Sequence, residues 1–185
     1  MKKSILVTGM AGSGKSAVCE ELNKQGYKAY DIEDMDGLFK MVDKKTGEIF
    51  MGNDNDNLEI VKKRDWICDV EKLQKLVGSE SSDVAFYCGT ASNLDKILPF
   101  FDMIILLKSS PEILRKRLSS RKPGEFGRTK EVQDWVLSYK DWWEKETEGK
   151  GTIIIDADRR TEEVVKNVVE AASKKLGEER LIDRL

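Results

Sequence analysis

The chain has 185 residues, of which 39% are hydrophobic, and this length and composition predict one domain over residues 1–185 with a buried core. Its 32 Lys and Arg residues nearly balance its 34 Asp and Glu residues, so the net charge of -2 does not favour a nucleic acid or an anionic membrane as a partner. No apolar run near the N-terminus is long enough for a signal peptide or a membrane span, and we expect a cytoplasmic protein.

The composition also limits the chemistry that the protein can perform. The three cysteines, Cys19, Cys68 and Cys88, have no C-x-x-C spacing, which argues against a disulfide framework or a zinc site. The chain contains no histidine, so any acid–base step falls to carboxylates, lysines or water.

A glycine-rich turn follows the first apolar segment, residues 4–8, with the spacing G-x-x-x-x-G-K-S of a phosphate-binding loop. The glycines let backbone N–H groups approach phosphate oxygens, and a helix from Gly14 to about Gln25 points its positive end at the same anion. We expect Lys15 to neutralise the β/γ-phosphates and the hydroxyl of Ser16 to bind Mg²⁺. A turn that binds nothing is the alternative, but three glycines in six residues would then destabilise it without benefit. The predicted ATP contacts are Gly9, Met10, Ala11, Gly12, Ser13, Gly14, Lys15, Ser16 and Ala17.

Four carboxylates follow a second short strand, residues 27–30. Ligands of open α/β sheets bind at the carboxyl ends of the strands, so this acidic run is expected beside the phosphate loop. We assign Asp31 to orient or deprotonate an acceptor hydroxyl, and Asp31, Asp34 or Glu33 to hold Mg²⁺. A solvated acidic turn is the alternative interpretation.

The middle of the chain predicts two short strands, 38–42 and 48–51, around a glycine-containing turn. Apolar residues three and four apart predict a helix over 66–77, with Trp66 in the core rather than against a ligand. A third strand over 83–88 then ends in small residues, Gly89-Thr90-Ala91-Ser92-Asn93, at the ligand edge.

The second half predicts strands over 103–107 and 152–155, with helices between and after them. A helix from Ser110-Pro111 ends at Lys122-Pro123-Gly124, and a long helix runs from Thr129 to about Lys145. Trp135, Trp142 and Trp143 on the long helix serve either packing or a partner surface. Because strands and helices alternate, we predict an α/β fold with a parallel sheet and helices on both faces.

The phosphate loop, the acidic run and Arg117-Leu118-Ser119-Ser120-Arg121 together resemble the small P-loop kinases, a group that holds nucleoside monophosphate kinases and shikimate-kinase-like proteins. Segments 30–34, 88–93 and 126–127 look closest to bacterial "AAA family ATPase" or adenylate-kinase-like proteins. The resemblance implies a three-layer P-loop NTPase fold with a five-stranded parallel sheet in the order 2-3-1-4-5. It also implies an acceptor-side insert at about 31–65 and a lid at about 118–130.

The resemblance further implies that Arg117 stacks on adenine and that Arg121 or Arg128 reaches the phosphates, and we add Asp156 to the nucleotide contacts. The chain departs from the group after its third strand, where it has neither the arginine of nucleoside monophosphate kinases nor the glycine triplet of shikimate kinases. A Walker B carboxylate is also missing at the end of that strand. The expected acceptor contacts are Asp34, Arg64, Gly89, Ser92 and Asn93.

The leading hypothesis is an ATP- and Mg²⁺-dependent phosphotransferase that acts on a nucleoside, a nucleotide or another small metabolite. Only Arg64, Lys62 and Lys63 could clamp a phosphate in the acceptor-side insert, so a hydroxyl acceptor is slightly favoured. The alternative is an ATP-binding switch or adaptor that acts through a protein partner. A polynucleotide kinase is disfavoured, because no basic stripe with interleaved aromatic residues is present. The oligomeric state is left open between monomer and dimer.

Overall fold

The computed structural model describes residues 2–52 and 54–177. Its strands are β1 (Lys3–Gly9), β2 (Lys28–Asp31), β3 (Phe39–Asp43), β4 (Arg64–Cys68), β5 (Val84–Cys88), β6 (Met103–Lys108) and β7 (Ile153–Asp156). Its α-helices are α1 (Lys15–Lys24), α2 (Leu58–Lys62), α3 (Val70–Ser79), α4 (Leu94–Ile97), α5 (Pro111–Ser119), α6 (Lys130–Ser138), α7 (Lys140–Glu148) and α8 (Thr161–Leu176), and the 3₁₀ turns are η1 (Ile32–Asp34) and η2 (Leu98–Phe100).

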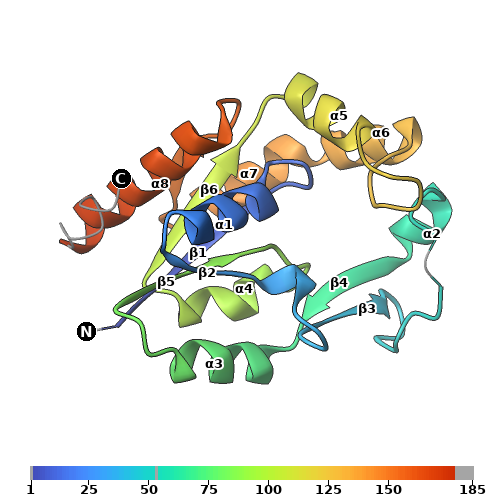
Figure 1. The fold of residues 1–185 in the computed structure, drawn as a ribbon. Coiled ribbons are helices and arrows are strands. Elements are labelled where there is room, and N and C mark those ends of the chain that lie inside the picture. The colour runs from blue at the N-terminus through green and yellow to red at the C-terminus, as the bar shows by residue number, and fades with distance from the viewer. Residues whose placement is uncertain (1, 53, 178–185) are drawn as a thin grey trace.

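Five strands form one parallel sheet in the order β2-β5-β1-β6-β7 (Figure 1). Counted along the predicted strands this is the order 2-3-1-4-5, so the α/β fold prediction is confirmed. The central strand β1 places Val7 opposite Cys88 of β5 and Ile105 of β6. Because all five strands are parallel, their carboxyl ends share one edge of the sheet, where the phosphate loop and the acidic run both begin.

Helices cover both faces of this sheet, as Figure 1 shows with α1 and α8 on one side and α3 and α4 on the other. The alternation of side chains along β1 explains the two layers, since Ile5 and Val7 pack against α1 and α8 while Leu6 packs on the opposite face. Both faces are therefore apolar, which accounts for the nearly continuous hydrophobic runs in the central strands. Within the described part of the chain, no helix has the length and the apolar character needed to cross a membrane.

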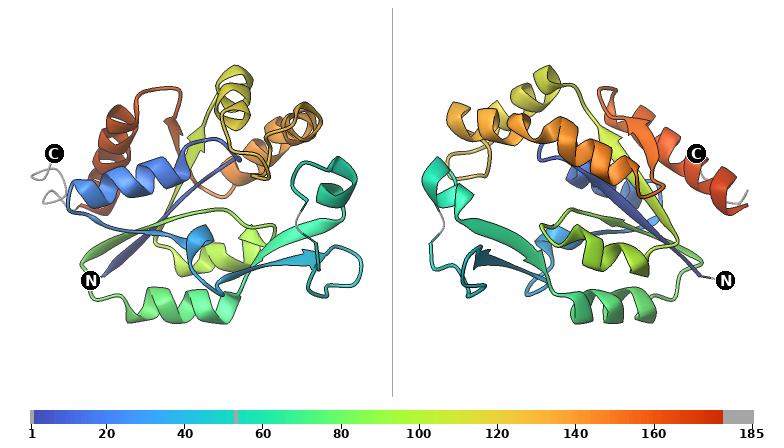
Figure 2. Two further views of the ribbon diagram at one scale, coloured as in Figure 1. Left: turned by 45° about the vertical axis from the view of Figure 1, so that its right-hand side comes forward. Right: turned by 180° about the vertical axis from the view of Figure 1, so that it is seen from behind.

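The strands β3 and β4 form a separate antiparallel pair that projects to one side of the main sheet (Figure 2). This corrects two predictions. The helix expected over 66–77 begins only at Val70, because Trp66 and Ile67 pair with β3 and the side chain of Asp69 caps the helix by accepting the N–H of Lys72. The strand expected over 48–51 is reduced to a single bridge between Val42 and Ile49.

The long helix expected from Thr129 to Lys145 is also divided. Tyr139 has φ of -112° and ψ of 3°, outside the α-helical range, and separates α6 from α7. The break lets α6 contact α5 and α2 while α7 packs against β6. One predicted helix thus becomes two elements with different neighbours.

Candidate active site

The phosphate loop is held in a tight turn between β1 and α1. A Cβ atom on Gly9 would lie 2.5 Å from Oγ of Ser13 and 2.7 Å from the carbonyl oxygen of Leu107, so only glycine fits there. The loop closes on itself through the N–H of Ser13, which donates to the carbonyl of Met10 at 3.0 Å. The backbone is therefore shaped as the sequence pattern predicts, with the first turn of α1 directly behind it.

Lys15 is buried at the start of α1 and its ammonium group faces the loop and the acidic run. Its Nζ atom donates to the carbonyl oxygens of Gly9 at 3.1 Å and Met10 at 3.4 Å, and it lies 3.5 Å from Oε1 of Glu33. Glu33 also accepts the backbone N–H of Thr90 at 3.0 Å. The sequence named Glu33 only as an alternative magnesium carboxylate, and its place in the acidic run after β2 was the signal for a closer role.

Gly89 allows the close approach of η1 to the end of β5 that brings Glu33 near Lys15. A Cβ atom on Gly89 would lie 2.5 Å from Cγ1 of Ile32 and 3.1 Å from Cγ of Glu33. The lack of a side chain therefore lets η1 approach the end of β5, which brings Glu33 to Thr90 and Lys15. Gly89 itself does not line the cavity described next, and its predicted contact with the acceptor stays a prediction.

A cavity of about 1420 Å³ opens above the phosphate loop. It brings together residues of the phosphate loop, the acidic run, the acceptor-side insert, the segment after β5, the predicted lid, and helices α6 and α7. The predicted site residues that line it are Gly9, Met10, Ala11, Lys15, Ser16, Asp31, Asp34, Arg64, Ser92 and Arg121.

Arg117 and Asp156 lie outside that cavity, on the other side of the phosphate loop. Arg117 donates to the carbonyls of Gly12 at 3.3 Å, Ser13 at 3.2 Å and Ala157 at 2.8 Å, and so ties the phosphate loop to the segment after β7. Asp156 accepts the N–H of Asp158 at 3.0 Å, and this bond, aided by Arg159, lowers the pKa of its carboxyl. The predicted adenine stacking by Arg117 and nucleotide contact by Asp156 stay predictions.

Two further predicted residues are engaged by protein groups in this structure. The amide of Asn93 donates to the carbonyl of Cys68 and accepts its N–H, both at 3.0 Å, which docks β4 against the loop after β5. Arg128 lies 3.6 Å from a carboxylate oxygen of Asp56 and does not line the cavity. A catalytic role for Arg128 and an acceptor contact by Asn93 therefore need a rearrangement, and both stay predictions.

The predicted lid touches the acceptor-side insert. The side-chain amide of Asn55 donates to the carbonyl of Gly124 at 2.7 Å and accepts a hydrogen bond from Arg64. Thr129 adds a bond from its hydroxyl to the carbonyl of Asp56 at 3.4 Å. Asn55 thus links the buried Arg64 on the cavity wall to the loop between α5 and α6.

Arg64 and Arg121 are the two arginines that line the cavity. Burial lowers the pKa of Arg64 from its usual range, against the opposing effect of Asp54, and burial likewise lowers the pKa of Arg121 against Glu125 and Glu33. Both guanidinium groups stay charged at neutral pH because arginine starts so far above it. Among the described ion pairs, neither arginine has a carboxylate within 4.0 Å, so each carries charge that a ligand can use.

The residues of the cavity fit a magnesium ion that arrives with nucleotide phosphates. Magnesium in such sites uses one or two carboxylates and the phosphates, and it keeps several waters. Among the residues that the structure describes, no group of three or more acidic or cysteine side chains is placed to hold a metal ion by itself. Ser16, Asp31 and Asp34 line the same cavity as Lys15 and supply the hydroxyl and carboxylate oxygens that magnesium prefers.

Comparisons with solved structures find the same fold in several kinases. Deoxyadenosine kinase from M. mycoides with bound dATP matches with a TM-score of 0.57 and 14% identity, over 94% of this chain and 100% of that chain. Shikimate kinase from Acinetobacter baumannii in complex with shikimate matches with a TM-score of 0.57 and 13% identity, over 95% of each chain. A gluconokinase from Sinorhizobium meliloti 1021 matches with a TM-score of 0.51 and 20% identity, over 98% of this chain and 97% of that chain. At these identities the likeness establishes the fold.

A comparison with curated protein sequences finds no match. A family model described as "AAA domain" matches residues 5–136, which is more than half of the chain and includes the phosphate loop, the acidic run and α5. The chain therefore belongs to this AAA-domain family, and its fold is that of the small P-loop kinases.

Proposed function

We propose that this protein is an ATP-dependent phosphotransferase that transfers the γ-phosphoryl group of ATP to a hydroxyl group of a small molecule. The observation that carries the proposal is that Lys15 of the phosphate loop and the carboxylates of Asp31, Glu33 and Asp34 line one cavity. Phosphoryl transfer depends mainly on positioning and on neutralising charge, and this cavity offers groups for both. The structural neighbours named as kinases support the same class of reaction.

In the proposed reaction, the acceptor oxygen bonds to the γ-phosphorus while the bond from that phosphorus to the bridging oxygen of ADP breaks. Lys15 balances the charge on the transferring phosphoryl group, and the hydroxyl proton moves to a carboxylate oxygen of Asp31. A magnesium ion, when bound, would neutralise charge on the phosphates, with Ser16 and Asp34 as its protein ligands. Arg121 supplies a further positive charge from the start of the lid.

Glu33 has a separate proposed task from Asp31. Its carboxylate is already occupied by Lys15 and by the N–H of Thr90, so it is poorly placed to accept a proton from the acceptor. It instead fixes the position of the Lys15 ammonium group before the nucleotide binds. Asp31 lines the cavity at the end of β2 and remains the better proton acceptor.

A hydroxyl acceptor fits the cavity better than a phosphate-bearing acceptor. Arg64 already donates to the carbonyl of Gly52 at 3.4 Å and to the side chain of Asn55. The other two candidate cations, Lys62 and Lys63, are exposed and do not line the cavity. Lys44 of the insert does line the cavity, but it lies 3.7 Å from a carboxylate oxygen of Asp65. The insert therefore lacks a pair of free basic groups that could grip an acceptor phosphate.

A screen for phosphoryl transfer tests the proposal directly. The protein is mixed with Mg²⁺, ATP and panels of nucleosides, nucleotides and small alcohols, and ADP and phosphorylated acceptor are measured together by mass spectrometry. The proposal expects the two products in equal amounts. If no acceptor is phosphorylated while a protein partner stimulates ATP hydrolysis, the switch or adaptor hypothesis replaces it.

A further inference from the structure

All four tryptophans of the chain line the proposed catalytic cavity. Trp66 comes from β4, Trp135 from α6, and Trp142 and Trp143 from α7, so three elements outside the phosphate loop contribute them. Phe50, Phe126 and Tyr139 add three more aromatic side chains to the same cavity. We call these seven residues the aromatic wall. Because these residues come from separate elements, the apolar face of one amphipathic helix does not explain why they lie together.

Two tryptophans of the aromatic wall each pack against another aromatic ring. Phe39 stacks on Trp66 with ring centroids 5.3 Å apart and 25° between the planes, and Tyr139 meets Trp135 at 5.1 Å and 65°. Both tryptophans still line the cavity. Trp142 at its margin is 65% exposed, so apolar ring surface is present there for a ligand to cover.

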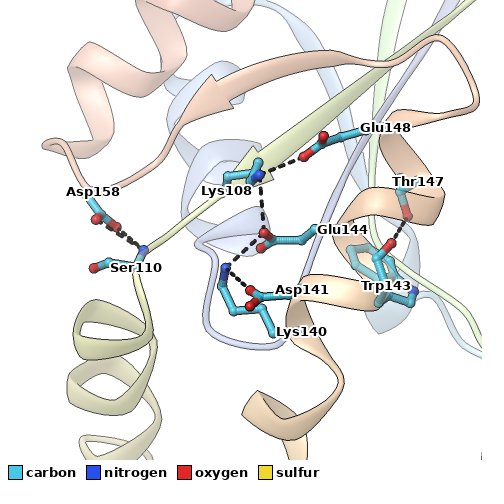
Figure 3. Close-up of polar contacts among 9 residues, drawn as sticks. All are labelled: Lys108, Ser110, Lys140, Asp141, Trp143, Glu144, Thr147, Glu148 and Asp158. Atoms are coloured by element: carbon cyan, nitrogen blue, oxygen red, sulfur yellow. Dashed lines mark hydrogen bonds and ion pairs between the residues drawn. The ribbon is translucent and has the colours of Figure 1, made fainter.

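An ion-pair network joins α7, the helix that carries Trp142 and Trp143, to the end of β6, and Figure 3 shows it beside Trp143. Glu144, which is buried, pairs with Lys140 at 2.8 Å and with Lys108 at 3.5 Å. Lys108 also pairs with Glu148 at 2.6 Å. The ion pairs thus hold in place the helix that contributes two residues of the aromatic wall, and a preformed binding site benefits from such rigid support.

The charged groups near the aromatic wall are largely paired with each other. Lys44 lies 3.7 Å from Asp65, and Lys150 lies 2.7 Å from Asp95. Lys44 also places its ammonium group 5.6 Å from the ring centroid of Trp135, so that ring already has a cation beside it. This arrangement disfavours a cationic ligand. Of the other cavity cations, Arg64 is hydrogen-bonded to Gly52 and Asn55, and Arg121 is assigned to the transferring phosphoryl group.

The volume of the cavity allows two ligands at once. Sites for a single small ligand usually occupy roughly 300–1,000 Å³, and this cavity has about 1420 Å³. A nucleotide on the phosphate loop would therefore leave space beside the aromatic wall. A flat ring would bury apolar surface against the tryptophans, whereas a polyol or a small carboxylic acid would leave those rings uncovered.

We propose that the acceptor is an uncharged hydroxyl compound built on a flat aromatic or heteroaromatic ring system. Its ring packs against the aromatic wall while its hydroxyl group reaches Asp31. This inference rests on the proposed phosphotransferase function and names the class of its acceptor. Nucleosides and simple aromatic alcohols share this chemistry, and the experiment below separates them.

Because every tryptophan lines the cavity, intrinsic tryptophan fluorescence reports directly on its occupancy. The protein, saturated with Mg²⁺ and a non-hydrolysable ATP analogue, is titrated with the four ribonucleosides, with pyridoxine, with gluconate, with shikimate and with choline. N-acetyltryptophanamide is titrated in parallel to correct for light absorbed by the ring compounds. We expect a saturable response to nucleosides or to pyridoxine, and the responding compound identifies the source of the ring. A response only to gluconate, shikimate or choline would overturn the inference.

Variants locate the binding surface. Because Trp142 is mostly exposed, Trp142→Ala is expected to fold, and it should weaken the affinity for the ring compound by roughly 2- to 12-fold. Ile154→Ala is the matched control, because Ile154 is also exposed but does not line the catalytic cavity. Both variants should bind the ATP analogue as the parent protein does. Unchanged affinity for the ring compound in Trp142→Ala and Trp135→Leu together would overturn the inference.

A transfer assay on the same compounds separates this inference from the proposed function. Phosphorylation of a ring compound supports both. Phosphorylation of a non-aromatic alcohol alone would overturn the inference and leave the phosphotransferase in place. Fluorescence-detected binding of a ring compound that is never phosphorylated would overturn the acceptor assignment. The proposed function would be overturned as well only if no other compound of the panel is phosphorylated.

Discussion

The Nζ atom of Lys15 lies 3.5 Å from Oε1 of Glu33, and the same Oε1 atom accepts the N–H of Thr90 at 3.0 Å. Three segments that are distant in sequence therefore meet at one carboxylate: the phosphate loop, the turn after β2 and the turn after β5. The contact holds Lys15 in place in a partly buried site, where a charge is stabilised by a fixed partner. It also leaves Asp31 free for the acceptor.

Lys15→Ala should abolish useful binding or turnover of Mg-ATP and leave the fold intact. A hydrogen bond to a charged group contributes about 1.5–3 kcal/mol, so affinity should fall roughly 10- to 150-fold. Titration calorimetry measures the affinity, and circular dichroism monitors the fold. Lys15→Arg keeps the charge but changes the shape of the donor, and it should recover binding only in part. Unchanged affinity and turnover in Lys15→Ala would show that the loop is not a nucleotide site.

Asp31→Asn and Glu33→Gln should separate the two carboxylates. If Asp31 is the general base, Asp31→Asn should reduce phosphoryl transfer by about 10²- to 10⁴-fold with much less effect on ATP affinity. Glu33→Gln removes the ion pair with Lys15 and should alter ATP affinity more than it alters the pH dependence of transfer. Transfer by Asp31→Asn at the parental rate would remove the assignment of Asp31.

Gly89→Ala should destabilise the protein and displace Glu33. The added Cβ atom would lie 2.5 Å from Cγ1 of Ile32, and overpacking of this kind costs about 1–3 kcal/mol. Gly78→Ala is the control, because Gly78 lies in α3 with no atom within 4 Å of its added Cβ, and alanine favours the helix by up to about 1 kcal/mol. Urea denaturation should show a lower unfolding midpoint for Gly89→Ala and a higher one for Gly78→Ala than for the parent protein. Equal midpoints for the two variants would contradict the packing role of Gly89.

We expect the loop from Lys122 to Arg128 to act as a lid that closes on ATP. Asn55 links this loop to Arg64 through the carbonyl of Gly124, so Asn55→Ala should loosen it. Limited proteolysis of the parent protein should slow at this loop when a non-hydrolysable ATP analogue is bound, and Asn55→Ala should be cut faster in both states. Equal cleavage of the parent protein with and without the analogue would count against closure.

Arg121→Ala and Arg128→Ala should each lower turnover more than they lower thermal stability. Arg121 lines the cavity already, so its loss should act on the transferring phosphoryl group. Arg128 faces Asp56, and its effect requires that the lid rearranges when ATP binds. A parental turnover rate in Arg128→Ala would assign this arginine to the contact with Asp56 alone.

Glu144→Gln should destabilise the protein strongly, because it leaves the exposed Asp141 as the one described carboxylate beside the buried ammonium of Lys140. Breaking a buried pair from one side costs about 3–5 kcal/mol. Asp141→Asn is the control on the same helix, since Asp141 is fully exposed beside Lys140 and its loss should change little. The unfolding midpoint in urea measures both, and similar midpoints for the two variants would contradict a structural role for the network.

The elements that the sequence predicted correctly are those whose signals are local. The phosphate loop has a fixed spacing around Lys15, and strands such as β5 and β6 have nearly continuous apolar runs bounded by turns. Right-handed crossovers then account for a parallel sheet with helices on both faces. The order of its strands was implied by the resemblance to the small P-loop kinases.

The errors arose where long-range contacts decide the structure. Trp66 fits a helical pattern with Val70 and Leu73, but its backbone bonds to Ser92 and its strand pairs with β3, which a local pattern does not reveal. The aromatic wall was missed for the same reason, because Trp66, Trp135 and Trp142 come from three elements whose meeting depends on the whole fold. The assignment of Trp66 to the core is correct in part, because Trp66 packs against a buried hydrophobic cluster and also lines the cavity.

Transfer of the γ-phosphoryl group of ATP to an acceptor is tested by following both products of a single reaction. The protein is incubated with Mg²⁺, ATP labelled in its γ-phosphoryl group, and the ring compound that changes its fluorescence. We predict that the label appears on the acceptor, mole for mole with ADP, and that Asp31→Asn slows this transfer. Label found only in inorganic phosphate, at the same rate with and without the acceptor, would contradict it.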